Sequence, residues 1–212
     1  QPLKNKNIIV TAGPTLEPID PVRFISNHSS GKMGYAIADA ACNLGANVTL
    51  ISGPVHLNAH PEAQLINITT AKELLKSFEK IDLKTIDFIF MCAAVADYGP
   101  IEIKNKKIKK EDEKINIALK KNPDIIKLVS QKTEATIIAF ALETDKGKEN
   151  AQKKLKNKNA DYIVLNYANE QGAGFNTNTN HIYIYGKNNQ EVEFKKDRKD
   201  RIAYKIIKWV ID

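Results

Sequence analysis

The fold is decided by three neighbouring stretches: NIIVTA at residues 7–12, GKMGYAIADAACNL at residues 31–44 and NVTLIS at residues 47–52. The first and third are short and rich in β-branched residues, which is typical of buried strands. In the second, apolar residues recur at three- and four-residue steps, which predicts a helix with Ser30 as its N-cap and Gly45 just past its end. A strand, a helix and a strand in this order predict a βαβ unit of a parallel sheet.

The same alternation continues along the chain. The most apolar run, DFIFMCAA at residues 87–94, belongs in the middle of a sheet that is covered on both faces. Thr70 and Glu73 have capping-box spacing, while Pro123 and Asp197 are expected at the first position and at the N-cap of two later helices. Further strands are predicted over residues 64–68, 114–119, 136–142 and 161–166. Helices are predicted over residues 70–80, 122–131, 148–159 and 197–209. Loops are expected over residues 98–110 and 171–180, and a hairpin over residues 181–194.

Length and composition suit one domain, residues 1–212, because 42% hydrophobic and 27% charged residues are close to globular averages. These values exclude disordered, collagen-like and disulfide-scaffold proteins.

The longest apolar stretch, residues 88–96, has about half the length that a bilayer-spanning helix needs, and the opening QPLKNK lacks the apolar core of a signal peptide. We expect a Rossmann-like three-layer α/β fold with a mainly parallel sheet and a C-terminal β-hairpin, located in the cytoplasm and away from membranes.

The positive charge is dispersed. The chain has 32 Lys and Arg against 25 Asp and Glu, a net charge of +7, and its lysines occur along the whole length. Such a distribution is more typical of a solvated surface than of a nucleic-acid-binding stripe, so no nucleic-acid partner is predicted. Cys42 and Cys92 lie in apolar segments and are expected to be buried, reduced thiols. His28 and His60 show no ligand spacing, so no histidine metal site is predicted.

The loops after the first predicted strand are the first candidates for phosphate binding. Backbone N–H groups and the start of a helix meet at this edge of a doubly wound sheet, which points to Gly13 and to residues 30–33 (Ser30, Gly31, Lys32 and Met33). The alternative is that Gly31 and Gly34 only allow tight packing of the helix on the sheet. A Walker A loop is disfavoured by Ser26 and Met33, and a dinucleotide fingerprint lacks two of its three glycines.

Further candidates lie later in the chain, and Asp97 follows the most buried predicted strand at the same edge. Asp97 could hold a ribose hydroxyl or Mg²⁺, or could be a solvated turn residue. Phe140 could belong to the core or present its ring to a base. Lys154 and Lys158 are one helical turn apart, which suits either a polyphosphate or an exposed helix face. Lys107 lies in a lysine-rich loop that is either solvated or faces an anion.

Two residues of the first loop region have competing explanations. Arg23 is the only arginine in the first 197 residues. Its permanently charged, planar guanidinium suggests a phosphate ligand, with an ion pair to Asp20 as the alternative. Asn27 lies between polar residues, where asparagine is usually a turn former.

Together these segments resemble, in order and spacing, phosphopantothenoylcysteine synthetase, the phosphopantothenate-cysteine ligase of coenzyme A biosynthesis. The resemblance covers nearly the whole chain and is closest to the bacterial type, which is often fused behind a flavin-dependent phosphopantothenoylcysteine decarboxylase domain. Gln1 in place of Met then suggests an excised or trimmed domain. The segments that carry the resemblance are residues 15–34, 93–98, 107–110, 122–125, 140–144 and 154–166.

The resemblance implies a CTP-dependent ligation in two steps. The carboxylate of 4′-phosphopantothenate attacks the α-phosphate of CTP, which gives an acyl-cytidylate and pyrophosphate. The amine of L-cysteine then attacks the activated carbonyl and releases CMP. A homodimer and Mg²⁺ are also implied, and residues 187–194 or the lysine-rich loop would reach the neighbouring subunit. The preference for CTP rests on the bacterial type, since related eukaryotic enzymes use ATP.

The resemblance also assigns roles by position. Lys107 would stabilise charge on the phosphate under attack, and Asn27 would orient the phosphopantothenate carboxylate and later the acyl intermediate. Asp97 would lie near the ribose and the metal. The remaining roles are the cytosine pocket for Ala139 and Phe140 and the triphosphate for Lys154 and Lys158. Substrate binding is also expected of Ala94, and of Arg23, which as the only arginine of the first 197 residues would bind the phosphate of phosphopantothenate, across the dimer or within its own chain. Pro14 and Leu142 depart from the family pattern, and Pro14 lacks an N–H for a phosphate.

Two readings outside the ligase class remain. A dinucleotide-binding oxidoreductase would share the fold but should show the complete glycine fingerprint. A nucleic-acid-binding module is suggested by the net charge of +7 alone and would bind with a steep salt dependence.

Overall fold

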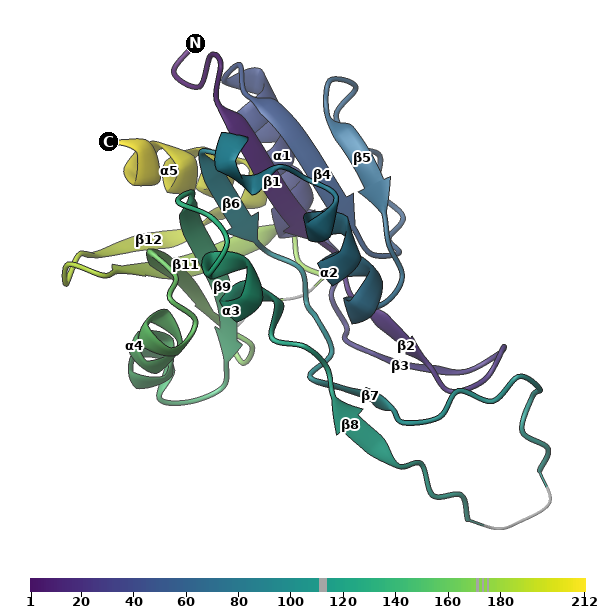
Figure 1. Cartoon of the computed structure of the whole chain (residues 1–212). Helices are drawn as coiled ribbons and strands as arrows, with labels where there is room; N and C mark the ends of the chain where they lie inside the picture. The colour runs from purple at the N-terminus through teal and green to yellow at the C-terminus, as the bar shows by residue number, and fades with distance from the viewer. Residues whose placement is uncertain (111–113, 171, 173, 175) are drawn as a thin grey trace.

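The computed structural model describes residues 1–110, 114–170, 172, 174 and 176–212. Its centre is an eight-stranded sheet with the strand order β12-β11-β10-β9-β6-β1-β4-β5 (Figure 1). The six strands from β10 to β5 run parallel, and β11 and β12 continue the sheet antiparallel. These eight strands are β1 (Asn7–Ala12), β4 (Asn47–Ser52), β5 (Gln64–Asn67), β6 (Phe88–Met91), β9 (Thr136–Glu143), β10 (Tyr162–Tyr167), β11 (Thr179–Gly186) and β12 (Glu191–Arg198).

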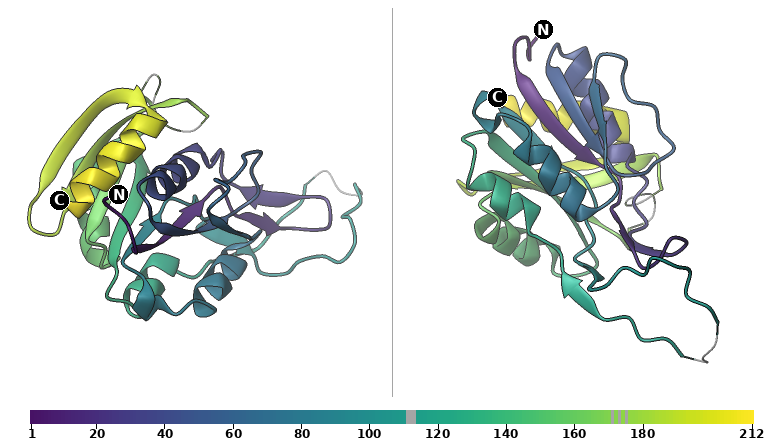
Figure 2. Two further views of the ribbon diagram at one scale, coloured as in Figure 1. Left: turned by 90° about the horizontal axis from the view of Figure 1, so that it is seen from above. Right: turned by 45° about the vertical axis from the view of Figure 1, so that its right-hand side comes forward.

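Helices cover both faces of the sheet, so the fold has three layers (Figures 1 and 2). Side chains of α1 and α5 share one hydrophobic core with the sheet, and side chains of α2, α3 and α4 share the other. The expected three-layer α/β fold is confirmed. The helices are α1 (Lys32–Asn43), α2 (Ala71–Glu79), α3 (Ile125–Ser130), α4 (Gly147–Asn157) and α5 (Lys199–Ile211), with a 3₁₀ turn η1 (Leu83–Thr85).

Local signals place several of these elements. Gly45 has a φ of 93°, and the bonds from its N–H to Cys42 and from Ala46 N–H to Ala41 end α1 in a Schellman motif. Thr70 caps α2 by accepting the N–H of Glu73, as its spacing predicts. The C-terminal hairpin also forms, as β11 and β12, and β12 is the outer edge of the sheet.

Three predicted caps are wrong. The N-cap of α1 is Gly31 rather than Ser30. Gly31 has a φ of 75°, and no side chain caps the helix. Asp124 caps α3 by accepting the N–H of Lys127, so Pro123 precedes the helix instead of opening it. Asp197 is the penultimate residue of β12, and α5 begins after Arg198.

The strand expected over residues 114–119 is also wrong. Residues 114–118 are exposed and lie outside any strand, because the alternating pattern there has no apolar layer to cover it. The strand that does form is β8 (Leu119–Lys121), which pairs antiparallel with β7 (Tyr98–Pro100) at the start of the predicted loop. Part of the loop predicted over 171–180, namely residues 171, 173 and 175, lies outside the described residues, and Thr179 and Asn180 belong to β11.

Residues 98–110 and 114–121 form an arm that extends from the body of the molecule (Figure 1). A second hairpin, β2 (Leu16–Pro18) and β3 (Phe24–Ser26), lies beside the base of the arm. The described part of the chain contains no helix that is long and apolar enough to cross a membrane.

Candidate functional site

Two adjacent cavities open at the carboxyl ends of the central strands. The larger, about 580 Å³, lies between the ends of β6 and β9 and the helices α3 and α4, and the smaller, about 150 Å³, lies at the amino end of α1. Ala93, Ala94 and Phe140 line both cavities, so the two spaces meet there. In an open parallel sheet this edge is where ligands bind.

Most predicted site residues line one cavity or the other. Gly13, Arg23 and Lys107 line neither. Those in the larger cavity are Asn27, Ala94, Asp97, Ala139, Phe140, Lys154 and Lys158, and those in the smaller are Ser30, Gly31, Lys32, Met33, Ala94 and Phe140.

Asn27 is fixed by the backbone of residue 94. Its Nδ2 donates to Ala94 O at 2.8 Å, which leaves Oδ1 and the second N–H of the amide for a ligand. Ala94 is held in turn by a bond from its N–H to Gly13 O at 2.9 Å and by a bridge to Pro14. The amide of Asn27 therefore has a defined direction at the junction of the two cavities. It is more than a turn former, because its side chain bonds a residue 67 positions away.

Two buried threonines hold the segment after β6 in place. Thr11 Oγ1 accepts the N–H of Ala93 at 3.1 Å, and Thr15 Oγ1 accepts the N–H of Ala96 at 3.0 Å. Both threonines are fully buried. Asn122 adds a bond from its Nδ2 to Ala96 O at 2.8 Å. These side-chain bonds satisfy backbone groups of Ala93 and Ala96 beyond the end of β6, where the segment lines the cavity.

Both cavity lysines of α4 are paired with carboxylates. Lys154 Nζ lies 2.7 Å from Glu143 Oε1, and Lys158 Nζ lies 2.5 Å from Asp124 Oδ2. Asn150 also donates to Glu143, at 2.9 Å. The larger cavity therefore carries two cations whose charge is already balanced by neighbouring acids.

Asp97 is the candidate metal ligand. It is exposed and lines the larger cavity, and its backbone carbonyl accepts the N–H of Asn122 at 2.9 Å. Within the described residues no cluster of three or more His, Cys, Asp or Glu side chains forms a metal site. A single carboxylate fits Mg²⁺, which usually keeps several waters and takes further oxygen ligands from substrate phosphates.

Glycines at the start of α1 serve different purposes. A Cβ on Gly34 would lie 2.7 Å from Ala12 Cβ, so this glycine allows α1 to pack on β1, as the packing alternative proposed. Gly31 instead adopts a positive φ at the helix start and lines the smaller cavity. Gly13 has a φ of 74° and packs next to Gly31. A Cβ added to Gly31 would lie 3.3 Å from the backbone N of Gly13.

Arg23 and Lys107 belong to the arm region. The guanidinium of Arg23 lies 2.7 Å from Asp20 Oδ2 and donates to Ile108 O at 2.6 Å, so the ion pair considered for it is present. Asp20 also accepts the N–H groups of Val22, Arg23 and Ile108. Burial alone would raise the pKa of Asp20, but these hydrogen bonds and the Arg23 side chain lower it to about 2. Lys107, next to Ile108, is exposed.

Sequence reasoning missed several polar residues of the smaller cavity. Lys199, Asn180 and Asn166 all line it, although each lies in a segment that was predicted as ordinary strand, loop or helix start. Cys92 lines it as well; the residue as a whole is half-buried, but burial raises the pKa of its thiol well above its ordinary value. Cys42 is buried as expected, and the burial raises its pKa to about 11.

The fold and cavities define an α/β protein with two adjoining cavities at the carboxyl edge of a mainly parallel sheet. The chain belongs to the family described as the DNA/pantothenate metabolism flavoprotein C-terminal domain, which matches residues 3–212. This finding confirms the family resemblance predicted from the sequence.

Similar proteins agree with this assignment. The chain is 46% identical over 189 residues to the coenzyme A biosynthesis bifunctional protein CoaBC of Vibrio vulnificus strain YJ016, covering 87% of this chain and 47% of that protein. It is 38% identical over 214 residues to the CoaBC protein of Escherichia coli strain K12, covering 99% and 52%. The chain thus spans about half the length of the curated relatives it matches. A crystal structure of the C-terminal domain of CoaBC has a TM-score of 0.82 at 36% identity and covers 99% of this chain and 96% of that chain.

Proposed function

We propose that this chain is a phosphopantothenate-cysteine ligase that uses CTP. It would join 4′-phosphopantothenate to L-cysteine through an acyl-cytidylate and release pyrophosphate and CMP. One observation carries the proposal: seven residues assigned to this chemistry from the sequence line one cavity at the carboxyl edge of the sheet. The cavity also opens onto a second one at the start of α1, where anions are favoured.

The amide of Asn27 supports the acyl-transfer part of the proposal. Because Nδ2 is held by Ala94 O, the amide has one N–H and one carbonyl oxygen left for the ligand. It would hold the phosphopantothenate carboxylate during activation and the acyl carbonyl during attack by the amine. Phe140 and Ala139 form an adjacent wall of the larger cavity, suited to a planar base. Asp97 would hold Mg²⁺ together with phosphate oxygens, and this ion would neutralise phosphate charge.

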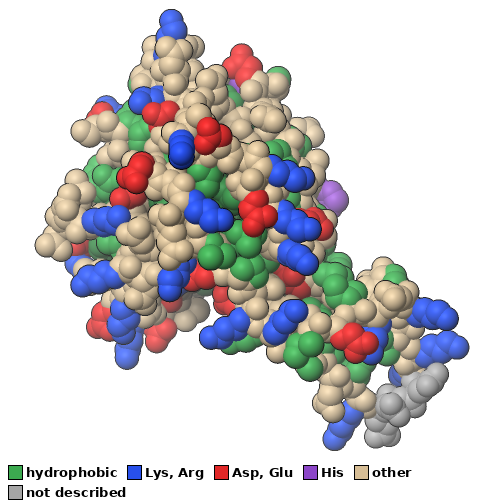
Figure 3. Space-filling view, in the orientation of Figure 1, with side chains coloured by type: hydrophobic (Ala, Val, Ile, Leu, Met, Phe, Trp, Pro, Cys, Tyr) green, Lys and Arg blue, Asp and Glu red, His purple; other side chains and the backbone are tan. Residues whose placement is uncertain are grey.

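We further propose that the enzyme is a homodimer in which the arm serves the neighbouring subunit. Lys107 and Arg23 line neither cavity of their own chain. Lys and Arg side chains gather around the outer end of the arm (Figure 3). Eight of the ten large, exposed hydrophobic residues found in the described part of the chain lie on the arm or beside it: Val22, Phe24, Tyr98, Ile101, Ile103, Ile115, Ile117 and Leu119. Such a surface suits a second copy of the chain, which would bring Lys107 to the partner's cavity.

Complementation would test the dimer. Lys107→Gln and Asn27→Asp subunits should each be impaired alone, and mixing them should restore activity, because each mixed dimer would have one site with both wild-type residues. No recovery after verified subunit exchange, or a monomer in sedimentation with ligands present, would refute the shared site.

A cytoplasmic location and a fused or separate phosphopantothenoylcysteine decarboxylase that consumes the product also belong to the proposal.

Pyrophosphate release tests the reaction itself. The assay contains CTP or ATP, phosphopantothenate and cysteine, each omitted in turn. Release that needs phosphopantothenate but not cysteine would support the acyl-nucleotide half-reaction. A chain that releases no pyrophosphate with either nucleotide in the complete mixture would refute the proposed function.

A further inference from the structure

The ammonium group of Lys199 is buried at the smaller cavity. Lys199 is the first residue of α5, is only 7% exposed and lines the cavity. Its Nζ donates to Gly174 O at 2.9 Å, which accounts for one of its three donor positions. A buried ammonium group is costly unless it is paired with an opposite charge.

Among the described residues, Lys199 has no ion-pair partner. Across the described residues, no carboxylate lies within ion-pair distance of its Nζ, and the one charged group that influences its pKa is another cation, Lys32. Lys32 also lines the cavity, and its Nζ donates to Asn176 O at 3.1 Å and Asn178 Oδ1 at 2.8 Å. Both lysines therefore contact only neutral oxygen atoms here, in contrast to the ion-paired lysines of the larger cavity.

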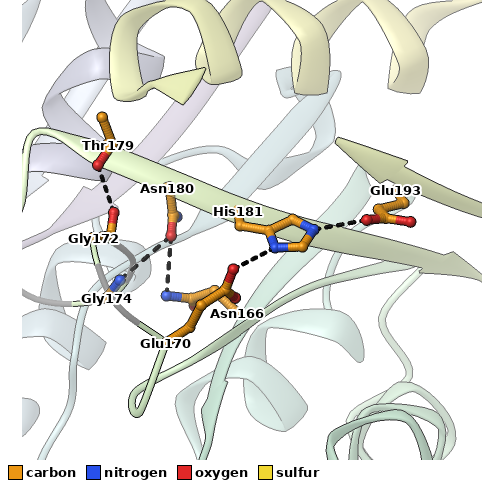
Figure 4. Close-up of polar contacts among 8 residues, drawn as sticks. All are labelled: Asn166, Glu170, Gly172, Gly174, Thr179, Asn180, His181 and Glu193. Carbon is orange, nitrogen blue, oxygen red and sulfur yellow. Dashed lines mark hydrogen bonds and ion pairs between the residues drawn. The ribbon is translucent and has the colours of Figure 1, made fainter. Parts of the chain in front are cut away.

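The loop that provides these oxygen atoms is anchored to the sheet (Figure 4). Asn180 Oδ1 accepts from Asn166 Nδ2 at 3.3 Å and from Gly174 N at 3.5 Å. His181 adds contacts from both ring nitrogens, to Glu170 at 2.5 Å and Glu193 at 2.8 Å. The bond from Gly174 N to Asn180 therefore ties the residue that accepts the Lys199 hydrogen bond to β11.

The opposite wall of the cavity is the amino end of α1. Its N-cap, Gly31, has no side chain to accept the free N–H groups, and the first turn contains no acidic residue. The N–H groups and the helix dipole at this end both favour a negative charge. Two uncompensated ammonium groups and an uncapped helix start therefore meet at one small cavity.

We propose that Lys199 is a phosphate-binding residue that, with Lys32 and the start of α1, holds the terminal phosphates of the nucleotide. The inference rests on the proposed function, since it places the polyphosphate of a nucleoside triphosphate in the smaller cavity. The phosphate supplies the negative charge that the two lysines lack within the described structure.

Binding measurements with Lys199→Met test this proposal. We expect the variant to bind CTP and inorganic tripolyphosphate about 10- to 100-fold more weakly, as for loss of a hydrogen bond to a charged group. CMP should bind as in the wild type, because it lacks the terminal phosphates. Lys208→Met, an exposed position on the same helix, is the matched control and should leave all three affinities unchanged.

A proton-uptake measurement separates phosphate binding from a structural role. Calorimetry at about pH 8.5 in buffers of different ionisation enthalpy should show wild-type protein taking up protons with tripolyphosphate, because the anion favours the charged lysine, and Lys199→Met taking up fewer. Equal CTP affinities, or equal proton uptake, in the two proteins would overturn the role of Lys199. Failure of the wild type to release pyrophosphate would instead overturn the proposed function, while tripolyphosphate binding by itself still reports on Lys199.

Discussion

Removing the buried charge of Lys199 should stabilise the protein in the absence of ligand, and the gain should depend on pH. Burial, and then the nearby charge of Lys32, lower the pKa of Lys199 from 10.5 to about 8. At ~1.4 kcal/mol per pKa unit, this corresponds to roughly 3 kcal/mol by which the folded state disfavours the charged form. The penalty is fully present below pH 8, where the lysine is charged in both states.

The direction of this pH dependence follows from how many protons each state binds. Between pH 8 and 10.5 the unfolded chain keeps the proton of Lys199 and the folded chain loses it, so this lysine makes folding stability rise with pH. Lys199→Met removes that term but leaves every other titrating group. Relative to the variant, the wild type should therefore gain about 3 kcal/mol of unfolding free energy between pH 7 and pH 10.5.

Urea unfolding of both proteins at several pH values between 7 and 10.5 measures this difference. Lys208→Met again provides the control, since its difference from the wild type should stay constant with pH. Tripolyphosphate at pH 7, at concentrations that saturate both proteins, should narrow the difference in stability, because it binds the wild type about 10- to 100-fold more tightly than the variant. A difference between wild type and Lys199→Met that is constant with pH would refute the argument that burial disfavours the ammonium group.

Three further predictions concern other parts of the chain. Lys107→Gln should slow acyl-cytidylate formation by roughly 10²- to 10³-fold, whereas Asn27→Asp should mainly slow discharge by cysteine; single-turnover reactions with labelled CTP follow both steps, and wild-type rates would refute the roles. Arg23→Lys should raise the KM for phosphopantothenate more than that for CTP, and lost thermal stability with unchanged kinetics would favour the ion pair with Asp20 alone. Gly34→Ala should cost about 1–3 kcal/mol in urea unfolding through its clash with Ala12, and an unchanged midpoint would show that α1 can shift.

Buried strands were the most predictable part of the fold. The bounds predicted for β1 and β4 agree with the structure at both ends, because their apolar runs are buried in the sheet and bounded by loop residues. The capping residues were less predictable. Ser30 has the right chemistry for an N-cap, but the chain turns one residue later, where Gly31 alone tolerates the positive φ.

Prediction of the site failed where function depends on contacts between distant segments. Phe140 was found because it lies near the end of a predicted strand, and parallel strands bring their ends to one edge. Asn27 was assigned its role by the family resemblance. Lys199 gave no such signal, since it is one of many lysines and its burial depends on a loop 25 residues earlier in the chain. The alternation at 114–119 predicted a strand wrongly, because a periodic pattern does not tell whether a hydrophobic layer is present to cover it.

The distribution of countercharges refines where the parts of the nucleotide are expected to lie. Lys154 and Lys158, assigned to the triphosphate by resemblance, each already contact a carboxylate, so a phosphate that binds them must compete with Glu143 or Asp124. Lys32 and Lys199 contact only neutral acceptors among the described residues, so a phosphate there gains attraction without displacing an acid. We therefore expect the terminal phosphates in the smaller cavity and the base, ribose and acyl group in the larger. The α-phosphate would then lie near Ala94, where the two cavities meet and where the amide of Asn27 is fixed.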